Sequence, residues 1–168
     1  MYFDPTHDYS DADLNISDNL IRWKFSRLIE NLVILSSSAQ RQAEIIGVGA
    51  VCEEMALDFE TYFTLEYPNY LEIGLLTMSQ LEKLQELDNF LEDKSGNNSP
   101  DFWNDLLLQQ SLEWQVVRQK AQGILVMLNM QDLTIDFERT EKTRTVDNGN
   151  PIMIQITKTR LVKKIINR

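Results

Sequence analysis

The chain has 168 residues, of which 43% are hydrophobic and 25% are charged. This composition is typical of a soluble globular domain and excludes a collagen-like or disordered chain. The single cysteine, Cys52, excludes an internal disulfide, and the single histidine, His7, excludes any site that needs two imidazoles. No apolar run is long enough for a transmembrane helix. Residues 1–15 carry acids where a signal peptide needs a basic segment and an apolar core.

The charge is distributed unevenly along the chain, whose formal net charge is -10. Residues 1–138 contain 8 Lys and Arg against 24 Asp and Glu, whereas residues 139–168 contain 8 against 2. A body this acidic repels nucleic acid and anionic membranes and attracts a basic partner. The basic C-terminal segment could bind phosphates or fold back on the acidic body. We favour folding back, because an unpaired acidic body repels itself.

The first half of the chain predicts an acidic arm and two helices. Residues 1–16 have no apolar period and are expected to form an irregular arm, with Ser17 as the N-cap of the first helix. That helix has one apolar stripe: Ile21, Phe25, Leu28, Leu32 and Leu35. A second helix is expected over residues 39–67, ended by Pro68. Its predicted core face is Ile45, Val48, Cys52, Met55, Phe59 and Tyr62.

Two more helices are predicted between residues 77 and 129, while residues 70–76 fit either a short helix or an extended connector. Thr77 and Gln80 form a capping box for the third helix, and Gly96 marks its C-terminal end. Ser99-Pro100 predicts the start of a fourth helix that reaches Asn129. This helix carries apolar residues on two opposite sides, so we expect it to be buried on both and to be the central element.

After residue 131 the apolar period changes from helical to alternating. Leu133, Ile135 and Phe137 alternate with polar residues, and so do Ile152, Ile154 and Ile156. Asn148-Gly149 between them favours a tight hairpin turn. An isolated β-hairpin is only marginally stable in water, so this hairpin must pack on the helices or pair with another chain. Residues 160–168 fit either a strand or a basic amphipathic helix.

The predicted fold is therefore mainly α: a four-helix bundle-like domain with a C-terminal β-hairpin. We expect a single domain over 1–168, made of an irregular acidic arm (1–16), a helical body (17–130) and a basic hairpin and tail (131–168).

Several patterns resemble known sites but lack a required part. Residues 11–17 resemble the start of an EF-hand loop, but Ile16 and Arg22 stand where glycine and glutamate are needed. Glu53, Glu54 and Asp58 have no histidine partner for a bundle di-iron site, so a solvated helix face is favoured. Cys52 lies on an apolar helix face and is expected to be a buried structural thiol. We predict no catalytic residues, no metal site and no cofactor.

Acidic residues accumulate on two helix faces where helix stability does not require them. Glu82, Glu86 and Asp93 follow a helical stripe opposite the leucines of the third helix. Glu53 and Glu60 flank Leu57 on the side of the second helix away from its core. Like charges at i, i+4 cost a few tenths of a kcal/mol. Acids around apolar anchors favour docking of a basic protein, so these six residues are the predicted partner-binding surface.

The segment from Leu76 to Met130 resembles the small bacterial immunity proteins that neutralise polymorphic or contact-dependent growth inhibition toxins. The resemblance lies in LTMSQLEKLQELDNFLEDKSG, DFWNDLLLQQSLEW and VRQKAQGILVMLNM, and in Phe102-Trp103, Trp114 and Arg118. It covers about a third of the chain. It implies a cytoplasmic, non-enzymatic inhibitor that covers the active or substrate-binding surface of a cognate toxin.

The leading functional hypothesis is therefore a protein-binding module of the immunity type, with a basic toxin domain as partner and no nucleic acid or membrane. Two alternatives stay open. One is a self-associating structural protein that forms a homodimer through the C-terminal hairpin. The other is an enzyme with an unrecognised carboxylate metal site.

Overall fold

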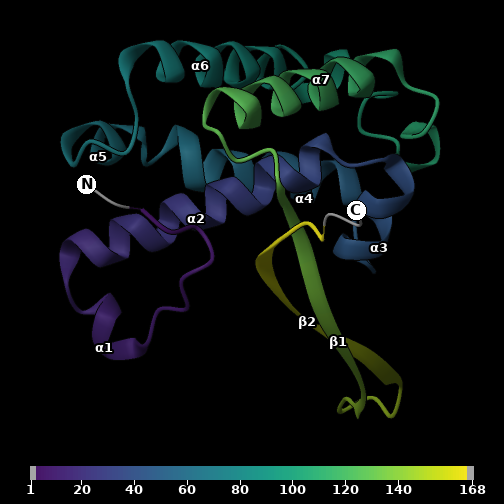
Figure 1. The fold of residues 1–168 in the computed structure, drawn as a ribbon. Helices are drawn as coiled ribbons and strands as arrows, with labels where there is room; N and C mark the ends of the chain where they lie inside the picture. The colour runs from purple at the N-terminus through teal and green to yellow at the C-terminus, as the bar shows by residue number, and fades with distance from the viewer. Residues whose placement is uncertain (1–2, 166–168) are drawn as a thin grey trace.

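The structure, a computed structural model, describes residues 3–165, apart from the side chain of Asn97. It is mainly α with a C-terminal antiparallel hairpin (Figure 1), which confirms the predicted fold class. The helices are α1 (Asp11–Leu14), α2 (Ser17–Ser36), α3 (Ala39–Ile46), α4 (Val51–Phe59), α5 (Tyr67–Glu72), α6 (Met78–Asp93) and α7 (Leu112–Met127). Shorter turns are the π-helical η1 (Glu60–Thr64) and the 3-10 turns η2 (Gly96–Asn98) and η3 (Asp105–Leu107). The strands are β1 (Leu133–Thr145) and β2 (Pro151–Lys163).

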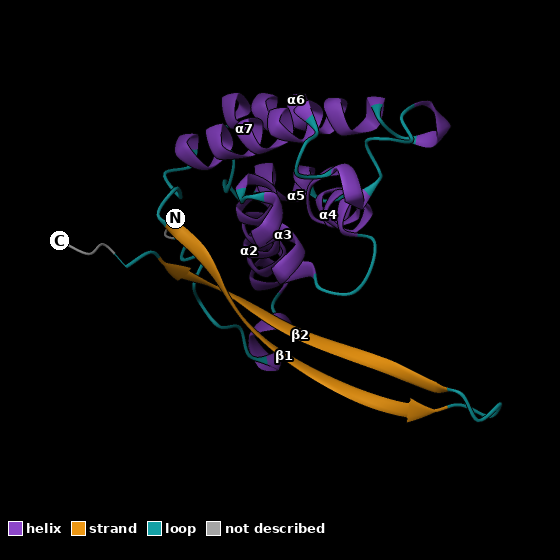
Figure 2. Cartoon of the chain, turned by 90° about the vertical axis from the view of Figure 1, so that its right-hand side faces the viewer, coloured by secondary structure: helices purple, strands orange, loops and turns teal. Residues whose placement is uncertain are grey.

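Helix α2 is the central element, because its second half is buried on every side. All residues from Leu28 to Leu35 are buried. Helices α6 and α7 form a layer over one side of α2, and the hairpin lies on another side (Figures 1 and 2). Buried polar side chains satisfy the main chain within this core: Asn31 donates to the Met55 carbonyl, and Gln42 donates to the Ile34 and Leu35 carbonyls.

The N-terminal arm is more ordered than predicted. It contains α1, whose N-cap is Ser10, with a capping box between Ser10 and Asp13. Ser17 is the first residue of α2 and not its N-cap, which is Ile16. The Phe3 ring packs edge-on against the Phe25 ring, with 5.0 Å between centroids, so the arm is attached to the core.

The prediction of one continuous helix over residues 39–67 is wrong. Gly47 adopts φ +75°, which ends α3, and α4 begins only at Val51. Val48 therefore lies in the connection and is 68% exposed, instead of lying in the core. Pro68 does not stop a helix but sits in the first turn of α5, where its missing N–H costs nothing.

Helix α6 has the predicted Thr77–Gln80 capping box and buries its leucines. The predicted fourth helix is wrong over residues 99–111, which form turns and the 3-10 segment η3. Helix α7 begins at Leu112, after the N-cap Ser111. It is buried on one face only: Leu112 and Val126 are exposed, so α7 is not the central element.

The hairpin pairs β1 with β2 from Leu133↔Lys163 to Thr145↔Pro151. Its inner half packs on the helices through three buried side chains: Leu133, Ile135 and Leu161. The Arg139 guanidinium donates to the Glu44 and Ile45 carbonyls, both at 2.8 Å. Only the inner part of the basic segment thus folds back on the body, and this arginine binds main-chain carbonyls and not carboxylates; residues 140–145 are exposed. Residues 160–163 continue β2, and residues 166–168 lie outside the described part.

Candidate protein-binding site

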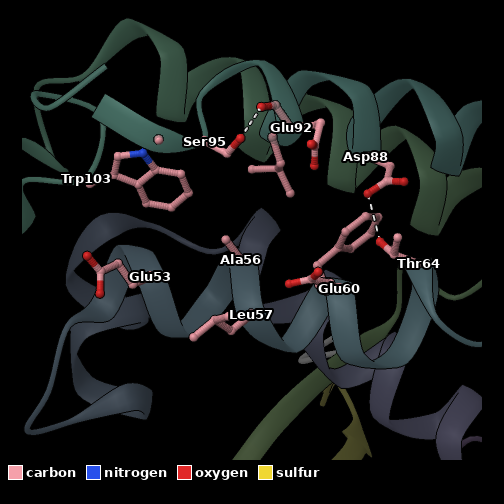
Figure 3. Close-up of a pocket in the computed structure, with 12 residues that line it drawn as sticks. Glu53, Ala56, Leu57, Glu60, Thr64, Asp88, Glu92, Ser95 and Trp103 are labelled. Atoms are coloured by element: carbon pink, nitrogen blue, oxygen red, sulfur yellow. Dashed lines mark hydrogen bonds between the residues drawn. The ribbon is translucent and has the colours of Figure 1, made fainter. Parts of the chain in front are cut away.

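A groove of about 510 Å³ lies between α4–η1 and the C-terminal end of α6 (Figure 3). We call it the acidic groove. Apolar side chains line it from three segments: Ala56, Leu57 and Phe59 of α4, Leu91 of α6, and Trp103 of the turn segment 99–111. Phe59 and Leu91 are buried, whereas Leu57 is 57% exposed at the rim. The groove therefore combines a fixed apolar floor with an accessible apolar anchor.

Four carboxylates line the two sides of the acidic groove. Glu53 and Glu60 come from α4–η1, and Asp88 and Glu92 come from α6. Asp88 accepts a hydrogen bond of 2.8 Å from the Thr64 hydroxyl. Within residues 3–165, the other three carboxylates have no hydrogen bond or ion pair to a side chain of the protein, and no Lys or Arg lines the groove. The groove is thus a site of uncompensated negative charge.

Local structure fixes α4 against the turn segment that carries Trp103. The N-cap of α4, Ala50, provides no side-chain hydrogen bond. Instead, the Asp105 carboxylate accepts from the Val51 and Cys52 amides at 2.9 and 3.0 Å. A negative charge at a helix N-terminus is favourable both for the free N–H groups and for the helix dipole. Asp105 therefore holds the two segments that form one end of the groove.

Two further contacts position the groove side chains. The Trp103 indole N–H donates to the Lys94 carbonyl at 2.6 Å, which sets the ring across the end of α6. At the other end, α4 passes into the π turn η1, closed by the bond from the Leu65 amide to the Glu60 carbonyl at 3.1 Å. Such π turns are rare and frequently occur at functional sites. Glu60 and Thr64, the first and last residues of η1, both line the groove.

The structure brings together three of the six predicted partner-binding residues. Glu53, Leu57 and Glu60 share the acidic groove. Glu82, Glu86 and Asp93 are exposed on α6 but do not line the groove. Glu86 is paired with Lys83 at 3.1 Å. The second set therefore forms a separate outer acidic stripe.

Sequence reasoning missed Asp88, Glu92 and Trp103 as groove residues. Asp88 and Glu92 lie next to the buried leucines of α6, at the edge where the apolar period places the border between the buried and the exposed face of the helix. Trp103 could not be placed because the Ser99-Pro100 signal assigns it to a helix. The sequence does hold a contrary signal: Asn104 and Ser111 are both N-cap residue types, and both cap a helical turn in the structure.

A second cavity, of about 220 Å³, lies on the other side of α4, between α2, α3 and the hairpin. Asp58 and Glu30 line it with Arg27, which pairs with Glu30 at 2.6 Å. Burial raises the pKa of both carboxyls above their ordinary values, and the Arg27 charge offsets part of that rise. The Glu30 carboxylate also accepts from the Thr159 hydroxyl at 3.1 Å, so it connects α2 to β2.

Cys52 is fully buried beside the Asp105 carboxylate, as predicted for a structural thiol. Burial, together with the hydrogen bond and negative charge of Asp105, raises the pKa of the thiol to about 12. A thiol so rarely ionised at neutral pH is a poor nucleophile.

Comparison of the chain with protein-family models, with curated proteins and with solved structures finds no match. Within residues 3–165, no three His, Cys, Asp or Glu side chains are grouped so that they could hold a metal ion. No helix of the described part is long and apolar enough to span a membrane.

Proposed function

We propose that the protein is a non-enzymatic binding module that holds a basic protein partner in the acidic groove, and that it is an immunity protein for a bacterial toxin. The observation that carries the proposal is the groove itself: an apolar floor between two rows of carboxylates, with no cation from the described part of the chain to neutralise them. A partner that inserts an apolar side chain beside Lys or Arg would satisfy both features.

The two acidic surfaces would contribute differently to binding. Carboxylates within the groove are desolvated when the partner docks, so their loss acts mainly on the dissociation rate. The outer stripe of Glu82, Glu86 and Asp93 stays in solvent and acts over a distance, so its loss acts mainly on the association rate and its salt dependence. An immunity protein benefits from both effects, because the toxin must be captured quickly and held.

The proposal is tested with the protein encoded beside this chain. Co-expression should rescue bacterial growth if that neighbour is a toxin, and the two purified proteins should associate faster at low salt than at high salt. Growth inhibition without rescue, or no association between the purified proteins, would reject the immunity function.

Two matched double variants then separate the surfaces, since each changes the net charge by the same amount. Glu82→Lys with Glu86→Lys should slow association and leave the melting temperature and the dissociation rate nearly unchanged. Glu53→Lys with Glu60→Lys should also raise the dissociation rate, by about tenfold or more if the groove carboxylates pair with partner cations. Equal effects of the two variants on both rates would show that the groove has no special role.

A further inference from the structure

One edge of β1 is free. The sheet contains only β1 and β2 within the described residues, so each strand is paired along one side alone. Figures 1 and 2 both show the outer half of the hairpin extending away from the helices. A free strand edge presents a row of main-chain N–H and C=O groups that can pair with another chain. Two strands alone are only marginally stable in water, so the outer half of this hairpin lacks support.

Four charged side chains on β1 have no partner within residues 3–165. Glu138, Glu141, Lys142 and Arg144 are exposed and form neither a hydrogen bond nor an ion pair with a described side chain. Only Asp136 on this strand is ion-paired, with Arg160 across the hairpin at 2.8 Å. Arg139 is the other charged side chain between Asp136 and Arg144, and it donates to main-chain carbonyls of the body.

The order of these charges is self-complementary. From Asp136 to Arg144 the strand reads acid, Phe, acid, base, Thr, acid, base, Thr, base. When two copies run antiparallel with Thr140 opposite Thr140, every charge meets an opposite charge. The opposed pairs are Asp136 with Arg144, Glu138 with Lys142 and Arg139 with Glu141, and the two-fold axis repeats each pair. Opposite charges directly across an antiparallel pair stabilise it, and like charges destabilise it.

We propose that the protein forms a homodimer in which β1 pairs antiparallel with β1 of a second copy about a two-fold axis at Thr140. The two hairpins join into a four-stranded sheet with β1 strands at the centre and β2 strands at the edges. The pairing spans residues 136–144, because the neighbouring Ile135 carbonyl already accepts from the Arg41 guanidinium at 2.6 Å. No residue of this interface lines the acidic groove, so the dimer is independent of the proposed function.

Other pairings of the hairpin fit less well. Centring the axis on Arg139 or Glu141 places two like charges directly opposite each other. The β2 edge carries only basic charges, Lys158, Arg160 and Lys163, and begins with Pro151, which has no N–H to donate. Its isoleucines could meet across an axis, but no charge pair would fix the register of that contact.

Charge exchange across the proposed axis tests the register. The full chain should sediment as a concentration-dependent dimer. Lys142→Glu and Glu138→Lys should each weaken dimerisation by about tenfold or more, because each turns two attractive cross-strand pairs repulsive. The double variant Glu138→Lys with Lys142→Glu should restore the dimer, since its pairs are again opposite in charge. It is made together with Lys158→Glu, because Lys158 lies opposite position 138 within the hairpin and would otherwise face a like charge. Lys163→Glu, with the same charge change on β2, should leave dimerisation unchanged.

Cross-linking gives a second readout that does not depend on charge. Cys52 is buried, so a cysteine introduced on β1 is the accessible thiol to follow. A short bismaleimide should join two chains of Thr140→Cys and should do so far less with Thr143→Cys, whose position faces Phe137 of the second copy in this register. Far-UV circular dichroism of every variant should match the parent.

Three results would overturn the proposal. The first is a parent chain that stays monomeric at all protein concentrations tested. The second is a dimer that Lys142→Glu and Lys163→Glu weaken equally, or that the double charge exchange fails to restore. The third is cross-linking of Thr143→Cys as efficient as that of Thr140→Cys, which would place the contact on another edge or in another register.

Discussion

Replacement of Trp114 tests the packing between α7 and the turn segment 99–111. Its side chain is fully buried, and its ring stacks on Phe102 with 4.6 Å between centroids and 8° between planes. The indole N–H donates to the Phe102 carbonyl at 2.7 Å. Trp114→Ala removes the ring and the donor together, so we expect a loss of about 3–5 kcal/mol in the free energy of unfolding. For a domain of this size that corresponds to a fall in melting temperature of roughly 6–20 °C.

Trp114→Phe separates the two contributions. It retains an aromatic ring for stacking but leaves the Phe102 carbonyl without its donor, which costs about 1–3 kcal/mol when the carbonyl is buried. Urea unfolding followed by far-UV circular dichroism is the appropriate assay, because the substitution itself changes tryptophan fluorescence. Trp103→Ala is the control: that ring is only half-buried, so its loss should cost less. A loss below about 0.5 kcal/mol for Trp114→Ala would refute the buried position, since surface substitutions cost no more than that.

Three further variants or reactions test single contacts. Cys52, with its pKa raised to about 12, should react with an aromatic disulfide at pH 8 no faster than the protein unfolds, and faster labelling would contradict its burial. Asp105→Ala should cost about 0.5–2 kcal/mol in urea unfolding, because it removes the carboxylate that caps α4. Gly47→Ala should cost about 1 kcal/mol or more, chiefly because φ is +75°, since the new Cβ meets only the flexible ends of side chains, with Gln155 Nε2 the nearest at 2.5 Å; an unchanged midpoint would show that the backbone at residue 47 can adopt another conformation.

The elements that could be predicted from sequence are those whose local signals agree. Helix α6 has a capping box that marks its start and an apolar period that marks its buried face, and the structure has both; the helix ends at Asp93, three positions before Gly96, which the sequence indicates as its end. The hairpin has two alternating segments on either side of Asn148-Gly149, and both strands form. Where several short-range signals coincide, tertiary contacts have little to change.

The failures occur where a long-range contact overrides a local pattern. The apolar period runs without a break from Ile45 to Tyr62, but the chain turns at Gly47 to meet the hairpin. The cap of α4 comes from Asp105, more than fifty positions along the chain, so no local signal could mark that boundary. Ser99-Pro100 is a helix-start signal that the structure does not use.

The candidate site was predictable in part, for the same reason. Glu53, Leu57 and Glu60 share one helix face, so periodicity alone groups them. The opposite side of the groove comes from α6 and from the segment around Trp103, and only the fold places these side chains against α4. A surface made of two helices can be predicted one helix at a time, but the pairing of its halves requires the tertiary structure.

The carboxyl group of Asp58 should reduce stability at neutral pH, which Asp58→Asn can reveal. Burial raises the pKa of this group above its ordinary value of 3.8, and Arg27 lowers it less than burial raises it. The folded protein therefore binds the Asp58 proton more tightly than the unfolded chain does. The resulting stabilisation is complete below about pH 3.8 and is lost as the pH rises through the raised value. At pH 7 the ionised group has no ion-pair partner within 4.0 Å among the described residues.

Asp58→Asn keeps the shape of the side chain and removes its charge. The variant should therefore be more stable than the parent at pH 7, and the difference should shrink as the pH falls towards 4. Burial raises the pKa of Glu30 and Glu54 near this cavity, and the Asp58 charge raises both further. The difference between the two curves therefore reports the burial of the Asp58 charge together with its repulsion of these two carboxyls, and both effects favour the variant at pH 7. Asp93→Asn, on the exposed face of α6, controls for the change in net charge. A variant less stable than the parent at pH 7 would mean that attraction to Arg27 outweighs the cost of burying Asp58, and that the charged pair holds α4 against α2.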